Sequence, residues 1–190
     1  MNDAPEKRDG KPRHGADEYG AVSGRGTFRI ERVLPGPIER VWTYLTDPEK
    51  RRKWLASGKM DLRVGGRVEL RFRFSELSPD QTPSGQASEC HVNGHITRID
   101  SPHLLSYTWG DQPEASEVTF ELFPHGQDVL LVITHRRLGD RGTMVSVASG
   151  WHTHLGILTD HLSGQQVRPF WPTKIRMATE YKSRLEDLTV

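Results

Sequence analysis

Histidine is the residue type best suited to proton transfer near neutral pH, and this sequence contains nine of them. His135 has the most favourable position, because it lies on the apolar side of an expected strand and would be half-buried opposite a bound molecule. An imidazole there can act as a general base. However, the sequence places no carboxylate to orient it, and no Ser or Cys catalytic signature accompanies it. His135 is therefore a weak catalytic candidate, and the sequence favours a protein without enzymatic activity.

The spacing of the histidines does not favour a metal site. His91 and His95 share a strand face, but four residues at about 3.3 Å each place them about 13 Å apart. Zinc–nitrogen bonds of about 2.0–2.1 Å cannot bridge that distance. His152 and His154 are two residues apart on an expected helix and point in different directions. His135 with His154 lacks a third ligand, so we predict neither a metal nor a cofactor.

Cys90 is the single cysteine, which excludes an internal disulfide and a cysteine-rich metal site. No catalytic signature surrounds it, and we interpret it as an ordinary strand or loop thiol. Glycine-rich phosphate loops are also missing, because Gly65-Gly66 and Gly24-Arg25-Gly26 match no nucleotide fingerprint.

Composition limits the classes of protein that this sequence can represent. A chain of 190 residues can bury one sizeable core. Lys plus Arg is 26 against 25 for Asp plus Glu, which gives no case for nucleic-acid binding. No apolar run approaches the roughly 18 residues that span a bilayer, and the polar N-terminus lacks a signal peptide's apolar segment, so a cytoplasmic location is expected. Residues 1–25 are charged and nearly free of apolar side chains, which predicts a disordered leader.

Residues 143–163 are expected to form the helix around which the domain is built. Apolar side chains recur there at steps of three or four, the period of a helix with one apolar face. Gly164 follows where a glycine commonly ends a helix. The stripe consists of Met144, Ala148, Trp151, Leu155, Leu158 and Leu162.

The segments before this helix alternate between apolar and polar side chains, as strands of an antiparallel sheet do when one face meets water. Hairpins in series followed by a long helix are typical of an α+β domain. The expected strands are 27–33, 68–74, 91–99, 104–109, 118–122 and 129–136, with a weak one at 61–63. The expected short helices are 38–45 and 48–53, a polar loop covers 75–87, and a last helix covers 173–188. Arg51-Arg52-Lys53 is interpreted as a solvated helix face.

In this order the chain resembles the START-like, or SRPBCC, superfamily, and within it the C-terminal domain of activators of the heat-shock-protein-90 ATPase and their bacterial homologues. The matching stretches are Pro37-Ile38-Glu39-Arg40-Val41-Trp42, Leu45-Thr46-Asp47-Pro48, Trp54, Gly65-Gly66, residues 94–102, Leu105-Ser106-Tyr107-Thr108-Trp109, Gly150-Trp151 and His154-Leu155. The resemblance covers about residues 27–163. The leader, the 75–87 loop and the segment after Gly164 lie outside it.

The resemblance implies a helix-grip fold, in which a curved antiparallel sheet surrounds a long C-terminal helix and two short helices follow the first strand. It divides the chain into a leader (1–25), a START-like domain (26–164) and a C-terminal extension with an additional helix (165–190). It also implies an apolar ligand cavity between helix and sheet. The expected lining residues are Trp54, Leu55, Phe72, Phe74, Tyr107, Trp109, Phe120, Ile133, His135, Trp151, His154, Leu155 and Leu158. Trp54 and Leu55 are expected at the mouth.

Three functions remain open at this point. The first is non-enzymatic binding of a small apolar or aromatic molecule in that cavity. The second is a protein-interaction module, either a chaperone cofactor or a homodimer through the apolar face of helix 173–188, although no separate chaperone-binding domain is visible in the sequence. The third is a cyclase-like or hydrolytic enzyme that uses His135. The ligand's identity and the role of the 75–87 loop do not follow from the sequence.

Overall fold

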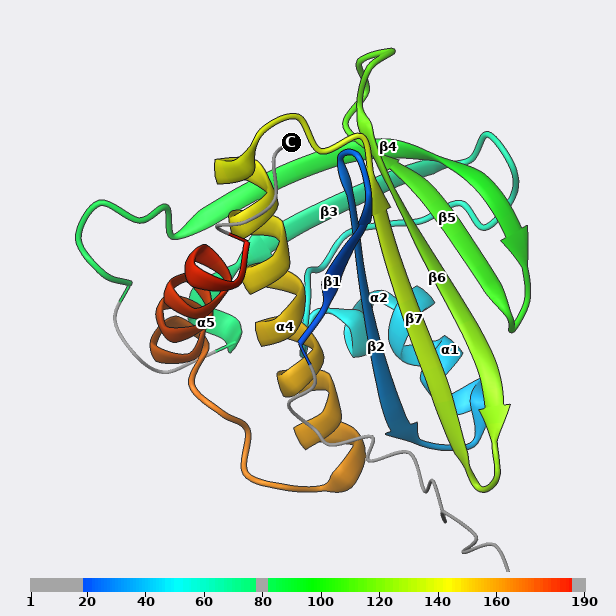
Figure 1. Ribbon diagram of the computed structural model, residues 1–190. Helices are drawn as coiled ribbons and strands as arrows, with labels where there is room; N and C mark the ends of the chain where they lie inside the picture. The colour runs from blue at the N-terminus through cyan, green and yellow to red at the C-terminus, as the bar shows by residue number, and fades with distance from the viewer. Residues whose placement is uncertain (1–18, 78–81, 186–190) are drawn as a thin grey trace, which may run out of the picture.

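A computed structural model describes residues 19–77 and 82–185, which form one curved antiparallel sheet with helices on its concave side. The strands are β1 (Ala21–Gly24), β2 (Thr27–Pro35), β3 (Arg67–Arg73), β4 (Glu89–Asp100), β5 (Leu104–Trp109), β6 (Ser116–His125) and β7 (Asp128–Arg136). The helices are α1 (Ile38–Thr46), α2 (Pro48–Arg51), α3 (Phe74–Leu77), α4 (Arg141–Ser163) and α5 (Phe170–Arg184). The strand order is β1-β2-β7-β6-β5-β4-β3. Helix α4 lies in the hollow of the sheet with α5 beside it, so the helix-grip architecture is confirmed (Figure 1).

Strand β3 shows why the sheet has one dry face. Val68, Leu70 and Phe72 are buried, whereas Arg67 and Arg71 on the opposite side are exposed. This alternation is the pattern that predicted the strand, and it directs the apolar side chains toward α4. The weak strand predicted at 61–63 is wrong, because the chain bends there, and the neighbouring bridges are made by Ser57 and Met60 instead.

Helix α4 begins at Arg141, two residues earlier than predicted. The Asp140 side chain caps it by accepting a hydrogen bond of 2.9 Å from the Thr143 backbone N–H. Gly164 ends it with φ 64°, a left-handed conformation that glycine adopts without steric cost. The predicted apolar stripe is buried throughout. However, His152, Thr153 and Ile157 on other faces are buried too, so the helix is enclosed rather than covered on one side.

Helix α5 provides the second cover for α4. It begins at Phe170 rather than at residue 173, and Pro172 fits inside its first turn because backbone N–H groups there have no intrahelical acceptor. Its apolar face, with Met177, Tyr181 and Leu185, is buried within the same chain. That face therefore does not supply the free surface on which the predicted homodimer depended.

The first strand was not expected. Residues 21–24, assigned to a disordered leader, form β1 and pair with β2 in the register Ala21↔Arg29. The Gly20 N–H also donates a hydrogen bond of 2.8 Å to the Tyr181 hydroxyl of α5. Residues 1–18 of the predicted leader, 78–81 of the predicted loop and 186–190 of the extension lie outside the described residues. The loop itself begins with the short helix α3, which includes Phe74.

Arg51 corrects the interpretation of Arg51-Arg52-Lys53 as a solvated face, since the Arg51 side chain is buried. Its guanidinium donates to the Thr46 carbonyl at 2.9 Å and to the Gly58 carbonyl at 2.5 Å. Burial lowers the pKa of Arg51. The side chain therefore closes the C-terminal end of α1 and holds the segment after α2 in place.

The connection between α4 and α5 is held by Asp160 and Arg168. Arg168 donates to the Asp160 carboxylate from Nε and Nη2, both at 2.8 Å, and from its backbone N–H at 3.0 Å. Burial alone would raise the pKa of Asp160, but these hydrogen bonds outweigh it and the pKa is lowered. The Arg168 side chain lies so close to α4 that a Cβ on Gly156 would be 2.6 Å from its guanidinium.

Two alanine substitutions in α4 are expected to have opposite effects on stability. Gly150→Ala should raise the free energy of unfolding by about 0.5–1 kcal/mol, since a Cβ there meets no atom within 4 Å and alanine favours helix. Gly156→Ala should lower it by about 1–2 kcal/mol, because displacing Arg168 weakens charge-assisted hydrogen bonds by more than the helix gains. Urea denaturation of both variants measures the difference. Equal stabilisation by both substitutions would show that Arg168 is not held against α4.

Candidate functional site

An apolar cavity of about 190 Å³ lies between the first half of α4, the sheet and α5. Strands β3 and β4 supply one wall, and seven of the fourteen lining residues carry an aromatic ring, counting the two histidines. It is lined by Leu55, Phe72, Phe74, Cys90, Val92, Trp109, His135, Ser146, Val147, Gly150, Trp151, His154, Phe170 and Lys174. Cys90 is exposed, so the cavity meets solvent near β4.

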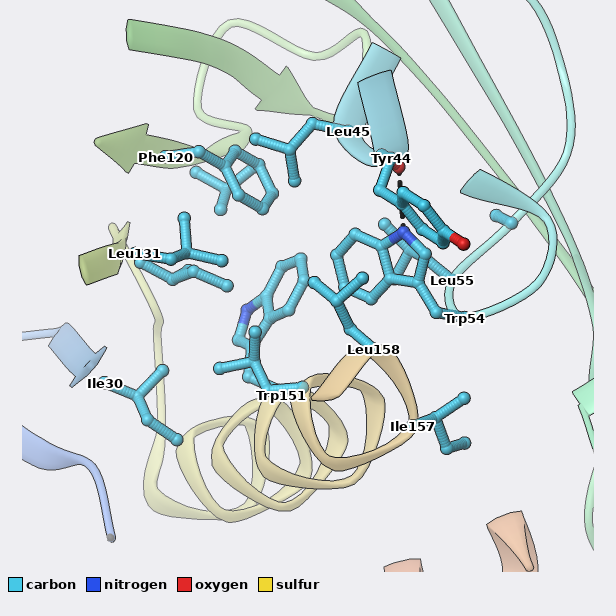
Figure 2. Packing of buried hydrophobic residues seen from close by; sticks show 14 of the residues in the cluster. Ile30, Tyr44, Leu45, Trp54, Leu55, Phe120, Leu131, Trp151, Ile157 and Leu158 are labelled. Carbon is cyan, nitrogen blue, oxygen red and sulfur yellow. Dashed lines mark hydrogen bonds between the residues drawn. The ribbon is translucent and has the colours of Figure 1, made fainter. Parts of the chain in front are cut away.

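Part of the predicted set lines this cavity, and part of it fills the core beyond. The lining members are Leu55, Phe72, Phe74, Trp109, His135, Trp151 and His154. Those that do not line it are Trp54, Tyr107, Phe120, Ile133, Leu155 and Leu158, all of them fully or almost fully buried in the packed core. The gap between helix and sheet is thus packed around Leu155 and Leu158 and open around Gly150. Figure 2 shows Leu158 among the packed core side chains.

Trp54 was expected at the mouth and is instead completely buried. Its indole Nε1 donates a hydrogen bond of 2.8 Å to the Tyr44 carbonyl, and its ring packs beside Leu158 (Figure 2). Its own carbonyl accepts a bond of 2.6 Å from His154. The neighbouring Lys53 carbonyl accepts a bond of 2.9 Å from His161, so two imidazoles of α4 anchor this segment.

His135 is held in a single protonation state by its two neighbours. The Trp151 indole N–H donates to Nδ1 at 3.1 Å, so Nδ1 carries no proton. Nε2 therefore carries the proton and donates to the Ser116 hydroxyl at 2.9 Å. Burial, and to a smaller degree the charge of Arg137, lower the pKa of His135 to about 4. With both nitrogens engaged, this residue could act as a general base only after one of these bonds breaks.

His154 is also neutral, with the opposite tautomer. A carbonyl can only accept, so the bond to Trp54 requires the proton on Nδ1, and Nε2 is left as an acceptor. Burial lowers the pKa of His154 to about 4, the Trp54 carbonyl opposes that shift, and the charge of Lys174 adds to it. No described residue forms a hydrogen bond with Nε2. His154 therefore supplies a hydrogen-bond acceptor at an otherwise apolar site.

Residues 35–163 match the family model described as activator of Hsp90 ATPase homolog 1-like protein. That stretch contains the strands from β3 to β7, α4 and most of the cavity lining. The chain belongs to this family.

Solved structures of bacterial proteins agree with that assignment. A Bordetella parapertussis protein is 38% identical, with coverage of 90% of this chain and 95% of that one and a TM-score of 0.74. A Chromobacterium violaceum protein is 27% identical, with coverage of 72% and 97% and a TM-score of 0.58. CalU16 from Micromonospora echinospora is 22% identical, with coverage of 89% of this chain and 96% of that one and a TM-score of 0.64. At that identity the likeness shows the fold alone. A search of curated proteins found no match.

Sequence reasoning missed half of the lining. On α4, Ser146 and Val147 lie about one turn before Trp151 and Gly150 directly precedes it, so the helix period could have located them. Cys90 and Val92 required the register of β4 against β3, where Cys90 pairs with Phe72. Phe170 and Lys174 belong to α5, which lies outside the stretch matched by the activator family model. Phe170 and Lys174 therefore make the C-terminal extension part of the cavity wall.

Metal-ligating side chains do not gather at this site. Within residues 19–77 and 82–185, no group of three His, Cys, Asp or Glu side chains is placed to hold a metal ion. None of the helices in those ranges is long and apolar enough to cross a membrane.

Proposed function

We propose that this START-like domain binds a small aromatic or apolar molecule in the cavity between α4, α5 and the β3–β4 side of the sheet. The observation that carries the proposal is the cavity itself, about 190 Å³ of space lined by aromatic and other apolar side chains with a few polar groups. Ligand sites are mostly apolar with a few polar groups that fix orientation. His154 and Lys174 are polar groups of that kind.

The size of the cavity limits the ligand. Drug-sized pockets run to about 300–1,000 Å³, whereas an apolar cavity of about 150 Å³ holds a benzene molecule. A one-ring compound therefore fits inside, and a larger one would extend toward the exposed edge near Cys90. Trp109 and Trp151, whose ring centroids are 5.5 Å apart in an edge-to-face arrangement, form an aromatic wall for such a ring.

Binding rather than catalysis follows from the state of the two histidines. Both are neutral near pH 7, and His135 has each ring nitrogen in a hydrogen bond with the protein. A general base needs a free lone pair within reach of the proton that it removes. Only Nε2 of His154 offers one, and the described lining contains no Asp or Glu that could orient it. We therefore infer a carrier or sensor of its ligand.

Titration of one-ring aromatic probes, phenylacetamide and phenylacetate, against tryptophan fluorescence tests this function. We expect a saturable change for at least one of them, because Trp109 and Trp151 line the site. A Kd between about 10 µM and 1 mM is expected for ligands of this size.

Gly150→Leu should weaken that binding at least tenfold. A Cβ at position 150 meets no atom within 4 Å, and Gly150 lines the cavity, so a leucine there would extend into the space that the probe would use. The matched control is Thr159→Leu, which adds a similar side chain to a half-exposed position of the same helix outside the lining and should leave binding unchanged. A wild-type protein that binds neither probe, or equal binding by Gly150→Leu, would contradict the proposed function.

A further inference from the structure

The described lining of the cavity carries a positive charge that no negative charge balances. Lys174 of α5 is the one permanently charged residue of the described lining, which includes no Asp or Glu. Its ammonium group forms neither an ion pair nor a hydrogen bond with any residue in the described ranges. The side chain is only partly exposed.

The unpaired ammonium group lowers the stability of the protein when no ligand is bound. Removing an ammonium group from water is unfavourable unless a negative charge or hydrogen-bond acceptors replace the water. Burial accordingly lowers the pKa of Lys174. His154 lines the same cavity, and its ring lies 5.2 Å from that of Phe170, one turn before Lys174 on α5. The charge of Lys174 contributes to lowering the pKa of His154.

Two other cations of the described chain, one partly and one fully buried, have partners. Arg168 forms a two-point ion pair with Asp160, and Arg51 donates to backbone carbonyls. Lys174 differs from both, because the described lining of the cavity contains no Asp or Glu to balance its charge. A bound anion would supply the balancing charge, and charge-assisted hydrogen bonds of this type are about twice as strong as neutral ones.

We propose that the cavity selects aromatic carboxylates, with the ring against the wall formed by Trp109, Trp151 and Phe72 and the carboxylate at Lys174. This inference rests on the proposed function and adds the charge of the ligand to it. A cationic ligand would be repelled by Lys174, and a neutral one would leave the ammonium group unsatisfied. Because Lys174 lies outside the stretch matched by the family model, this preference belongs to the extension of this chain.

The test compares phenylacetate with phenylacetamide, which have the same shape and differ in charge. In the wild-type protein, phenylacetate should bind about tenfold more tightly, and raising the salt concentration should reduce that difference. Lys174→Met, which keeps an unbranched side chain, should abolish the preference by weakening phenylacetate binding alone. Lys174→Arg should retain it.

Lys182→Met is the matched control, since Lys182 lies on the same helix, is exposed and does not line the cavity. It should behave as the wild type. The rate at which a thiol reagent modifies Cys90, the single cysteine, gives a second readout, because bound phenylacetate should slow it in the wild type and not in Lys174→Met.

The outcomes separate the two proposals. If both probes bind equally and Lys174→Met changes neither, the selection of carboxylates is wrong and the binding function stands. If neither probe binds the wild type, both are wrong. Preferential binding of phenylacetate that persists in Lys174→Met would also overturn the role of Lys174.

Discussion

Trp54→Ala is expected to lower the free energy of unfolding by about 3–5 kcal/mol, the range for removing a large buried aromatic side chain. Trp54 is 0% exposed, and its ring fills the space between Leu158 of α4 and the end of α1 (Figure 2). The substitution also leaves the Tyr44 carbonyl without the indole donor that lies at 2.8 Å. Urea denaturation followed by circular dichroism measures the loss.

Two other substitutions separate the contributions to this loss of stability. Trp54→Phe keeps most of the apolar surface and removes the indole donor, so a smaller loss of about 1–2 kcal/mol is expected. Trp42→Ala removes a tryptophan that is only partly buried against the same core and should cost less than half as much as Trp54→Ala. Equal losses at positions 42 and 54 would mean that Trp54 does not occupy the centre of the packed region.

Acidification should destabilise the protein between about pH 6.5 and pH 4. His135 and His154 have pKa values of about 4 in the folded state and an ordinary value of 6.5. In that window the unfolded chain binds protons that the folded chain excludes, so stability falls as the pH falls. Each histidine contributes a loss of up to about 3 kcal/mol, at 1.36 kcal/mol per pKa unit. Above pH 6.5 both states are neutral and these groups have no effect.

Denaturation midpoints measured from pH 8 to pH 4 test this expectation. His154→Asn retains a donor for the Trp54 carbonyl and His135→Gln retains one for Ser116, and neither side chain titrates in this range. Each should remove about half of the acid sensitivity. His91→Gln, at an exposed position of β4, is the control for the loss of an imidazole. An unchanged pH profile in both buried variants would show that these histidines are not excluded from protonation.

Much of the fold could be predicted because its signals are local. The alternation in β3 and the period of three and four residues in α4 each follow from which side chains face the core. Strand β1 could not be predicted, since its side chains are mostly exposed and its stability comes from pairing with β2 and from Gly20 bonding to Tyr181. Arg51 was misread for the same reason, because its acceptors lie in other segments of the chain.

The site was less predictable than the fold. Alternation directed Phe72 and Trp109 toward α4, and the helical period directed Trp151 toward the sheet. Neither pattern shows which side chains fill the interior and which leave space. Tyr107 and Leu155 have the same pattern and are packed. The empty volume depends on the summed sizes of side chains from distant strands and on the missing side chain at Gly150. The position of Lys174 at the cavity depends on how α5 packs against α4.

Two-dimensional NMR of the tryptophan indole N–H groups during addition of phenylacetate tests the central claim most directly. Trp109 and Trp151 line the cavity, whereas Trp42 on α1 and the buried Trp54 do not. We predict saturable shifts for the Trp109 and Trp151 signals with the same Kd, and no shift for Trp42. Unchanged Trp109 and Trp151 signals at saturating phenylacetate, or shifts confined to Trp42, would contradict a ligand held between α4 and the sheet.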